Sequence, residues 1–173
     1  MTTLRTRRLN DFDSLSVGDV LRPPGRTVTE ADIVAFAALT WDRHPVHVDA
    51  VWASKSTFRE RIAHGMLVLS YAVGLAPMDP DLILTLRSIR EATFKLPARI
   101  GDTIAVEIEI TELKPLTTEL GMLGTAWRIV NQDNRLLARL RVDLVCKRAP
   151  RRHTSIRPIA TDDSEADIGW IPV

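Results

Sequence analysis

The spacing of apolar and polar positions divides the chain into a helical first half and a stranded second half. Apolar side chains recur at helical spacing after Thr29, a residue type that caps helices, and they predict a helix from about 29 to 40. A second, short helix is predicted at 50–59. Residues 66–76 are apolar nearly all round, which is typical of a helix buried on every side.

The second half changes to a period of two. Apolar residues stand at every second position from Ile104 to Ile110, with polar residues between several of them, and predict a strand with one solvated face. A turn-forming cluster at 131–134 separates two further predicted strands, 122–130 and 136–147, and indicates a hairpin. Helices followed by three or four long strands predict an α+β fold with an antiparallel sheet that curves around the apolar helix.

The ends of the chain differ from this middle part. We expect a flexible N-terminus over 1–10, one domain over 11–148 and a polar C-terminal tail over 149–173. The first ten residues lack the apolar core of a secretory signal. No apolar stretch approaches the roughly 20 residues of a membrane-spanning helix. We therefore expect a cytoplasmic location and no membrane partner.

Charge and cysteine content exclude several classes of function. Lys and Arg total 23 and Asp and Glu total 22, which leaves a net charge of +1. Nucleic-acid-binding proteins usually carry a basic excess, so we expect no nucleic-acid partner. The single cysteine, Cys146, excludes an internal disulfide and a cysteine-based metal cluster.

The segment 40–49, directly after the first predicted helix, carries the first candidate chemistry. Asp42 and His47 are close enough in sequence for a turn to bring both side chains to one water, as a general acid/base pair. Alternatively, Asp42 caps the helix predicted at 50–59 or the loop itself, and His47 lies at the surface. A third alternative is a metal site made of Asp42, His44, His47 and Asp49. The spacing lacks the usual zinc pattern, so we expect no metal.

The second candidate is the pair His64-Gly65, which immediately precedes the apolar helix. The backbone N–H of Gly65 would lie at the positive end of that helix, where it can stabilise an oxyanion on a carbonyl group. The structural alternative is that Gly65 only permits a turn and His64 caps the helix.

Two stretches carry a resemblance to a known family. One is Trp41-Asp42-Arg43-His44-Pro45-Val46-His47, with Asp49 two residues later, and the other is Ile62-Ala63-His64-Gly65-Met66-Leu67. Together they resemble the MaoC-like dehydratases, also called the (R)-specific enoyl-CoA hydratase family, and the resemblance extends over about residues 12–147. It implies a hot dog fold, in which an antiparallel sheet wraps around a long central helix. It also implies a homodimer and a reaction that needs no cofactor.

The reaction implied by the resemblance is the reversible syn addition of water to a 2-enoyl thioester of coenzyme A or of an acyl carrier. In that reaction Asp42 and His47 would activate the water, and the Gly65 amide would bind the thioester oxygen. His44 and His64 would support the loop. Trp41 stands where the family usually has glycine, and His44 replaces an asparagine. A hot dog thioesterase and a non-catalytic acyl-thioester-binding subunit are the alternative functions.

Overall fold

A computed structural model describes residues 12–148 of the chain. The segments predicted as a flexible N-terminus (1–10) and a polar tail (149–173) lie outside the described residues. The helices are η1 (Phe12–Ser14), α1 (Glu30–Thr40), α2 (Pro45–Val48), α3 (Ala50–Lys55) and α4 (Gly65–Leu75). The strands are β1 (Val20–Leu21), β2 (Arg26–Thr27), β3 (Ile83–Phe94), β4 (Thr103–Pro115), β5 (Leu120–Val130) and β6 (Leu136–Lys147). Within the described range, none of the helices has the length and apolar character needed to cross a membrane.

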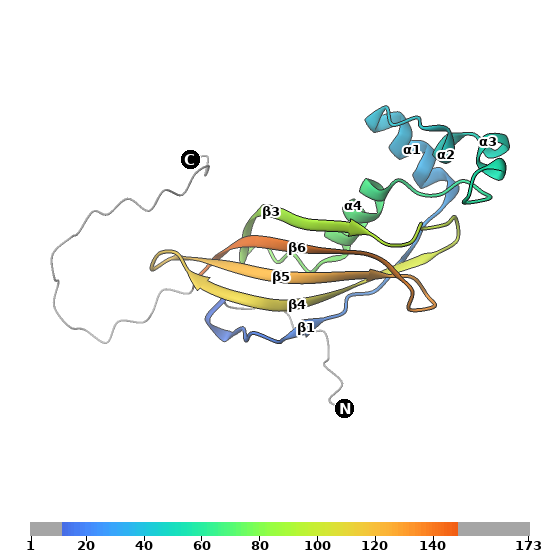
Figure 1. Cartoon of the computed structure of the whole chain (residues 1–173). Helices are drawn as coiled ribbons and strands as arrows, with labels where there is room; N and C mark the ends of the chain where they lie inside the picture. The colour runs from blue at the N-terminus through green and yellow to red at the C-terminus, as the bar shows by residue number, and fades with distance from the viewer. Residues whose placement is uncertain (1–11, 149–173) are drawn as a thin grey trace, which may run out of the picture.

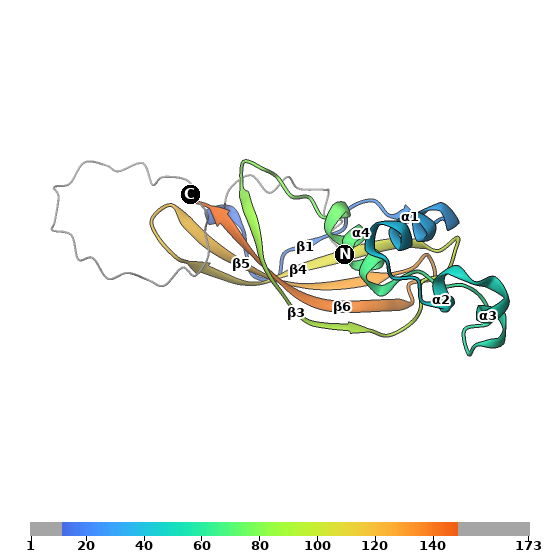
Figure 2. The ribbon, with the colours of Figure 1, turned by 90° about the horizontal axis from the view of Figure 1, so that it is seen from above.

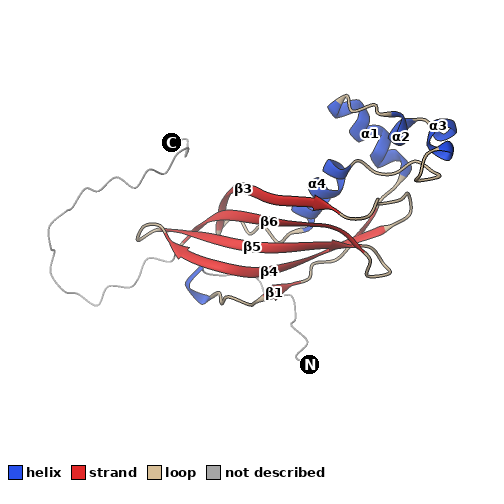
Figure 3. Cartoon of the chain, in the orientation of Figure 1, coloured by secondary structure: helices blue, strands red, loops and turns tan. Residues whose placement is uncertain are grey.

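The strands form one antiparallel sheet in the order β1-β4-β5-β6-β3, and β2 pairs with the start of β4 (Figures 1 and 3). The predicted hairpin is confirmed, because β5 and β6 pair along their length on either side of the turn at 131–134. The sheet twists and curves, and α4 lies against its inner face (Figure 2). The predicted α+β hot dog architecture is therefore confirmed. Helices α1, α2 and α3 gather at one end of the sheet.

The inner face of the sheet forms the core. Ile104, Val106, Ile108 and Ile110 are between 0% and 3% exposed, as their alternation predicts. The inner face also buries Trp127, whose indole N–H donates to Thr125 Oγ1 at 2.7 Å. That hydroxyl in turn donates to a backbone carbonyl of β6 at 2.8 Å. The polar atoms of this aromatic side chain are thus satisfied inside the core.

The prediction that the apolar helix is buried on every side is wrong for the single chain. Leu67, Leu69 and Ala72 of α4 are buried, whereas Met66 is 57% exposed. The sheet covers one side of α4 only, so its opposite side reaches solvent despite its composition. On the outer face of β6, Asp143 is buried.

The helices at the sheet's end begin and end at recognisable caps. Thr29 and Asp32 form a reciprocal capping box at the start of α1. The helix predicted at 50–59 ends earlier, at Lys55, because Ser56 is extended and its N–H and hydroxyl both donate to Ala53 O. Helix α1 stops at Thr40, and Trp41 follows in the left-handed region at φ 62°.

Candidate active site

The candidate segment 40–49 is a loop only in part, since residues Pro45–Val48 form the one-turn helix α2. Pro45 favours this turn because its ring fixes φ at a helical value and the first N–H of a helix needs no partner. His44 caps the turn through its Nδ1, which accepts a hydrogen bond from the N–H of Val46 at 3.2 Å. His44 thereby holds the segment in shape. Helix α2 places His47 toward the body of the protein, half-buried.

Asp49, not Asp42, caps the next helix. Its carboxylate accepts a hydrogen bond from the N–H of Trp52 at 2.9 Å at the start of α3. The alternative in which Asp42 caps that helix is therefore wrong, whereas Asp42 does cap the loop, since its carboxylate accepts a hydrogen bond from the N–H of His44 at 3.4 Å. The four residues considered as a metal site do not form one either. The atoms with which His44 and Asp49 would bind a metal instead accept hydrogen bonds as helix caps.

The side chains of Asp42 and His47 do come together, and His64 joins them. One oxygen or nitrogen from each of these residues lies within 4.8 Å of the other two. His64 is the residue just before α4, and its side chain is buried, with 1% exposed. Its ring stacks on that of His47, with centroids 3.8 Å apart and an angle of 27° between the planes.

The hydrogen bonds fix which ring nitrogens carry a hydrogen. His47 Nδ1 lies 2.8 Å from the carbonyl oxygen of Ile62, and His64 Nε2 lies 2.9 Å from the carbonyl oxygen of Asp42. A carbonyl oxygen only accepts, so each of these nitrogens donates. In the neutral rings, His47 Nε2 and His64 Nδ1 therefore carry lone pairs. His64 Nδ1 is buried without a hydrogen-bond partner among the described residues.

The surroundings of His47 favour its uncharged imidazole. Burial lowers the pKa of His47 below its ordinary value, and the nearby His64 and His44 lower it further. The hydrogen bond to Ile62 and the charge of Asp42 act in the opposite direction. With the pKa below its usual range, the imidazole is uncharged at neutral pH and can accept a proton.

The cluster opens onto a pocket of about 410 Å³. Its walls are mostly apolar and come from the α2, α3–α4, α4 and β3–β4 regions. They include Phe58, Ile62, Ala63, Met66, Val68, Phe94, Leu96, Pro97, Ala98 and Leu137, with Asp42, His47, His64, Gly65 and Lys95 as further lining residues. A concave apolar pocket with a few polar groups at one place is the usual form of a small-molecule site.

Gly65 lines the same pocket and is the first residue of α4. Its φ is not in the left-handed region, so the alternative in which glycine only permits a turn is wrong. A Cβ on Gly65 would instead lie 2.7 Å from Phe94 Cζ, so glycine lets that ring pack against the start of α4 and a larger residue would displace it. The first N–H of a helix has no partner within the helix and lies at its positive end. The His64 side chain makes no capping hydrogen bond, which contradicts its predicted alternative role.

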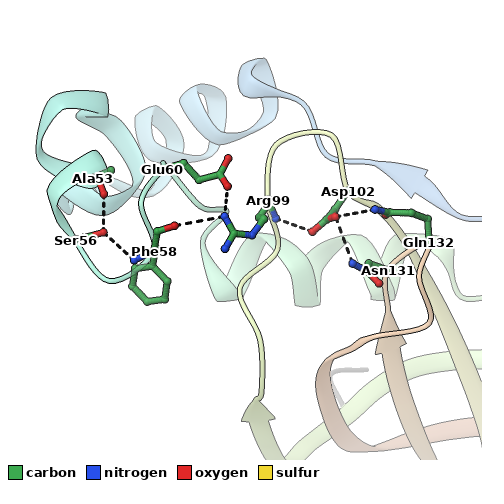
Figure 4. A network of polar contacts seen from close by, with 8 residues as sticks. All are labelled: Ala53, Ser56, Phe58, Glu60, Arg99, Asp102, Asn131 and Gln132. Carbon is green, nitrogen blue, oxygen red and sulfur yellow. Dashed lines mark hydrogen bonds and ion pairs between the residues drawn. The ribbon is translucent and has the colours of Figure 1, made fainter.

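A polar network braces the wall of the pocket (Figure 4). The backbone N–H of Arg99 donates to Asp102 at 2.8 Å, and its guanidinium contacts Glu60 and the carbonyl of Phe58. Asp102 also accepts a hydrogen bond from Gln132 in the β5–β6 turn at 3.1 Å. Three loops distant in sequence are thus joined. No local sequence pattern identifies this role of Asp102, because its partner Gln132 lies far along the chain.

The cluster suits a bound water better than a metal ion. A metal ion bound by imidazole lies in the plane of the ring, along the lone pair of the nitrogen. The spacing of the three side chains alone would allow an ion, but the rings of His47 and His64 are stacked with 27° between their planes, so one ion cannot lie in the plane of both rings at bonding distance. Asp42 and His47 alone offer two acceptors to one water, which has two hydrogens to donate.

The chain is similar to known proteins in sequence and in fold. A family model described as "MaoC like domain" matches residues 14–126. An (R)-specific enoyl-CoA hydratase from Rhodospirillum rubrum is 39% identical over 93 residues, which are 52% of this chain and 62% of the relative. The chain thus matches less than two thirds of that relative's length. An (R)-specific enoyl-CoA hydratase from Aeromonas caviae is 36% identical over 108 residues, 61% of this chain and 80% of that protein.

A solved structure shows the same architecture. The monoamine oxidase regulatory protein from Archaeoglobus superposes with a TM-score of 0.77 at 32% identity, over 85% of this chain and 100% of that one. The family match includes both candidate stretches, the segment around Asp42 and His47 and the start of α4.

Proposed function

Because the chain belongs to the MaoC-like domain family, we propose that it is a hydro-lyase that adds water reversibly to 2-enoyl thioesters. The observation that carries this proposal is the meeting of Asp42 and His47 beside an apolar pocket that also includes Gly65. The names of the two hydratase relatives support it. The product would be a 3-hydroxyacyl thioester.

In the proposed reaction, one water is held by the Asp42 carboxylate and by His47 Nε2. As the water oxygen forms a bond to C3 of the substrate, one O–H bond breaks and its proton passes to the Asp42–His47 pair. The electrons of the C2=C3 bond move toward the thioester oxygen and give an enolate. The pair then returns a proton to C2, so that one complete water has been added. Because both residues approach from one side, oxygen and hydrogen arrive on the same face.

The Gly65 amide would bind the thioester oxygen on which the negative charge develops. Two features support this role: the position of Gly65 at the start of the 11-residue helix α4 and its place in the pocket lining. The apolar walls suit the acyl chain, and the reaction needs no cofactor. The acyl group could be carried by coenzyme A or by a carrier protein, since both present the same thioester.

We also propose that the protein works as a homodimer. Strand β3 is an edge of the sheet and exposes apolar side chains. These are Leu84, Leu86, Ile89 and Phe94, between 39% and 49% exposed. An exposed apolar edge strand in a single chain is suited to pairing with another copy.

The test is a series of 2-enoyl-CoA substrates of increasing chain length, followed by loss of the absorbance of the conjugated thioester. We expect this absorbance to fall without release of free thiol for at least one substrate. A thiol-specific reagent in parallel reactions identifies a thioesterase, which would release free coenzyme A. Tight binding of the thioesters with neither change would identify a non-catalytic binding subunit. Either of these results would overturn the proposed hydratase.

A further inference from the structure

His64 makes contacts that neither packing nor helix capping explains. We propose that His64 is a positioning residue, which in its Nε2–H form holds both members of the Asp42–His47 pair in their working geometry. This inference rests on the proposed function of that pair. His64 acts through its neighbours and needs no contact with the reacting atoms.

The first contact fixes the position of Asp42. His64 Nε2–H donates to the backbone carbonyl of Asp42 at 2.9 Å, across a separation of 22 residues. The hydrogen bond joins the segment after α1 to the start of α4. Asp42 is otherwise exposed, and its other hydrogen bonds are long and local: its N–H donates to Thr40 Oγ1 at 3.3 Å, and its carboxylate accepts from the N–H of His44 at 3.4 Å. Without the bond from His64, the segment that carries the carboxylate loses its anchor to the helix.

The second contact fixes the ring of His47. The imidazole of His64 lies against His47 at 3.8 Å between centroids, and it also contacts the Phe36 ring of α1 at 5.0 Å. His47 is held at Nδ1 by the carbonyl of Ile62. The stacked ring restricts rotation about that hydrogen bond and so determines where Nε2 of His47 points. One buried side chain thereby couples α1, α2 and the start of α4.

A purely structural role predicts a different residue here. The His64 side chain makes no capping bond to α4, and its buried Nδ1 has no partner within residues 12–148. A phenylalanine has a similar shape and could stack on His47 without burying an unpaired acceptor, which is unfavourable. Only the Nε2–H group distinguishes histidine favourably from phenylalanine at this position. The bond to Asp42 is therefore the feature that requires histidine.

The pair His64→Phe and His64→Gln separates the two contacts. Phenylalanine keeps an aromatic ring on His47 but removes the donor to Asp42. Glutamine removes the ring but carries an amide N–H near the position of Nε2. In His64→Phe we expect kcat to fall about 100-fold, as for a small misplacement of catalytic groups, with KM changed less than threefold and Tm equal or higher. His64→Gln should recover part of the lost kcat.

The pH profile gives a second readout. The titratable groups that face His47 are Asp42, His44 and His64. Glutamine at position 64 uncovers one face of the His47 ring, so the pKa of His47 rises and the acid limb of kcat/KM moves to higher pH. An unchanged profile in His64→Gln, or wild-type kcat in His64→Phe, would overturn the proposal. A fall in kcat that only follows a fall in Tm would overturn it as well.

A measurement without substrate separates this inference from the proposed function. Long-range ¹H–¹⁵N correlation spectra of the imidazoles report which ring nitrogen carries the hydrogen. We expect His64 in the Nε2–H form, and a His47 titration that changes in both variants. If the wild-type protein hydrates no thioester but the spectra show the expected His64 form and His47 titrations, the proposed function fails and the coupling of His64 to His47 stands. A His64 ring with hydrogen on Nδ1 would overturn the coupling, whatever the activity.

Discussion

The inner face of the sheet and the segment from Trp41 to Gly65 differ in how their buried polar atoms are paired and in their backbone conformation. In the central strands β4, β5 and β6, the inward residues are apolar, and buried polar atoms such as those of Thr125 and Trp127 are paired. The Trp41–Gly65 segment has left-handed backbone at Trp41 and at Arg59, φ 62° and 67°. Within residues 12–148, it also contains the only buried side-chain nitrogen or oxygen without a partner, His64 Nδ1.

The contrast agrees with the proposal that the chemistry lies in the Trp41–Gly65 segment, while the sheet provides stability. Unfavourable local arrangements persist only where the surrounding structure enforces them, and they gather at functional sites. Here the sheet and α4 form the rigid support, and the Trp41–Gly65 segment is placed on it with Asp42 and His47. Substitutions in the two regions should therefore change different quantities.

The largest effect is expected from the acid/base pair itself. Asp42→Asn or His47→Asn should lower kcat about 1,000-fold or more, within the range of general acid/base catalysis. The Tm should stay within a few degrees, because neither side chain belongs to the core. Asp49→Asn is the matched control, since asparagine caps helices as well as aspartate does and should keep kcat near the wild-type value. Equal turnover in all three variants would remove Asp42 and His47 from the mechanism.

A core substitution should show the reverse behaviour. Ile104→Ala removes a fully buried side chain of β4 and should lower the free energy of unfolding by about 3 kcal/mol. Activity per folded molecule should change little at a temperature where the variant is folded. Chemical denaturation measures the first quantity, and Val17→Ala, at a position 62% exposed, provides the control with little change. A loss of kcat comparable to that of Asp42→Asn would contradict the separation of the two regions.

The smallest effect is expected at the start of the Trp41–Gly65 segment. Trp41 adopts φ 62°, where glycine is strained least, and its ring is 75% exposed beneath the Arg43 guanidinium. Trp41→Gly should raise the free energy of unfolding by about 0.5–1 kcal/mol, because relief of the backbone outweighs the exposed cation–π contact. Denaturant titration at one protein concentration measures this change. A loss of more than 1 kcal/mol would show that the tryptophan ring has a structural role.

Local sequence patterns predicted the fold better than they predicted the site. The period of two from Ile104 to Ile110 depends on one face of one strand, and the capping box of Thr29 depends on four adjacent residues, so both are visible in the sequence. The motif around Asp42 and His47 identified two residues that the structure brings together. Their catalytic roles stay predictions.

The features that escaped prediction all depend on residues far apart in the chain. Gly65 is constrained by the ring of Phe94, from the end of β3. Asp143 is buried on the outer face because Ser88 and Arg90 of the neighbouring strand donate to it, at 2.6 and 2.7 Å. Likewise, the partners of His64 come from α1, from α2 and from the segment between them. No local pattern contains these contacts.

In the proposed reaction, one site adds water to one face of an enoyl thioester. The most direct measurement is the NMR spectrum of the product formed by the wild-type protein from (E)-but-2-enoyl-CoA in D₂O. We expect 3-hydroxybutyryl-CoA with one deuterium at C2, on the same face as the new hydroxyl group at C3. Deuterium on the opposite face, or free coenzyme A and but-2-enoate as the products, would contradict it.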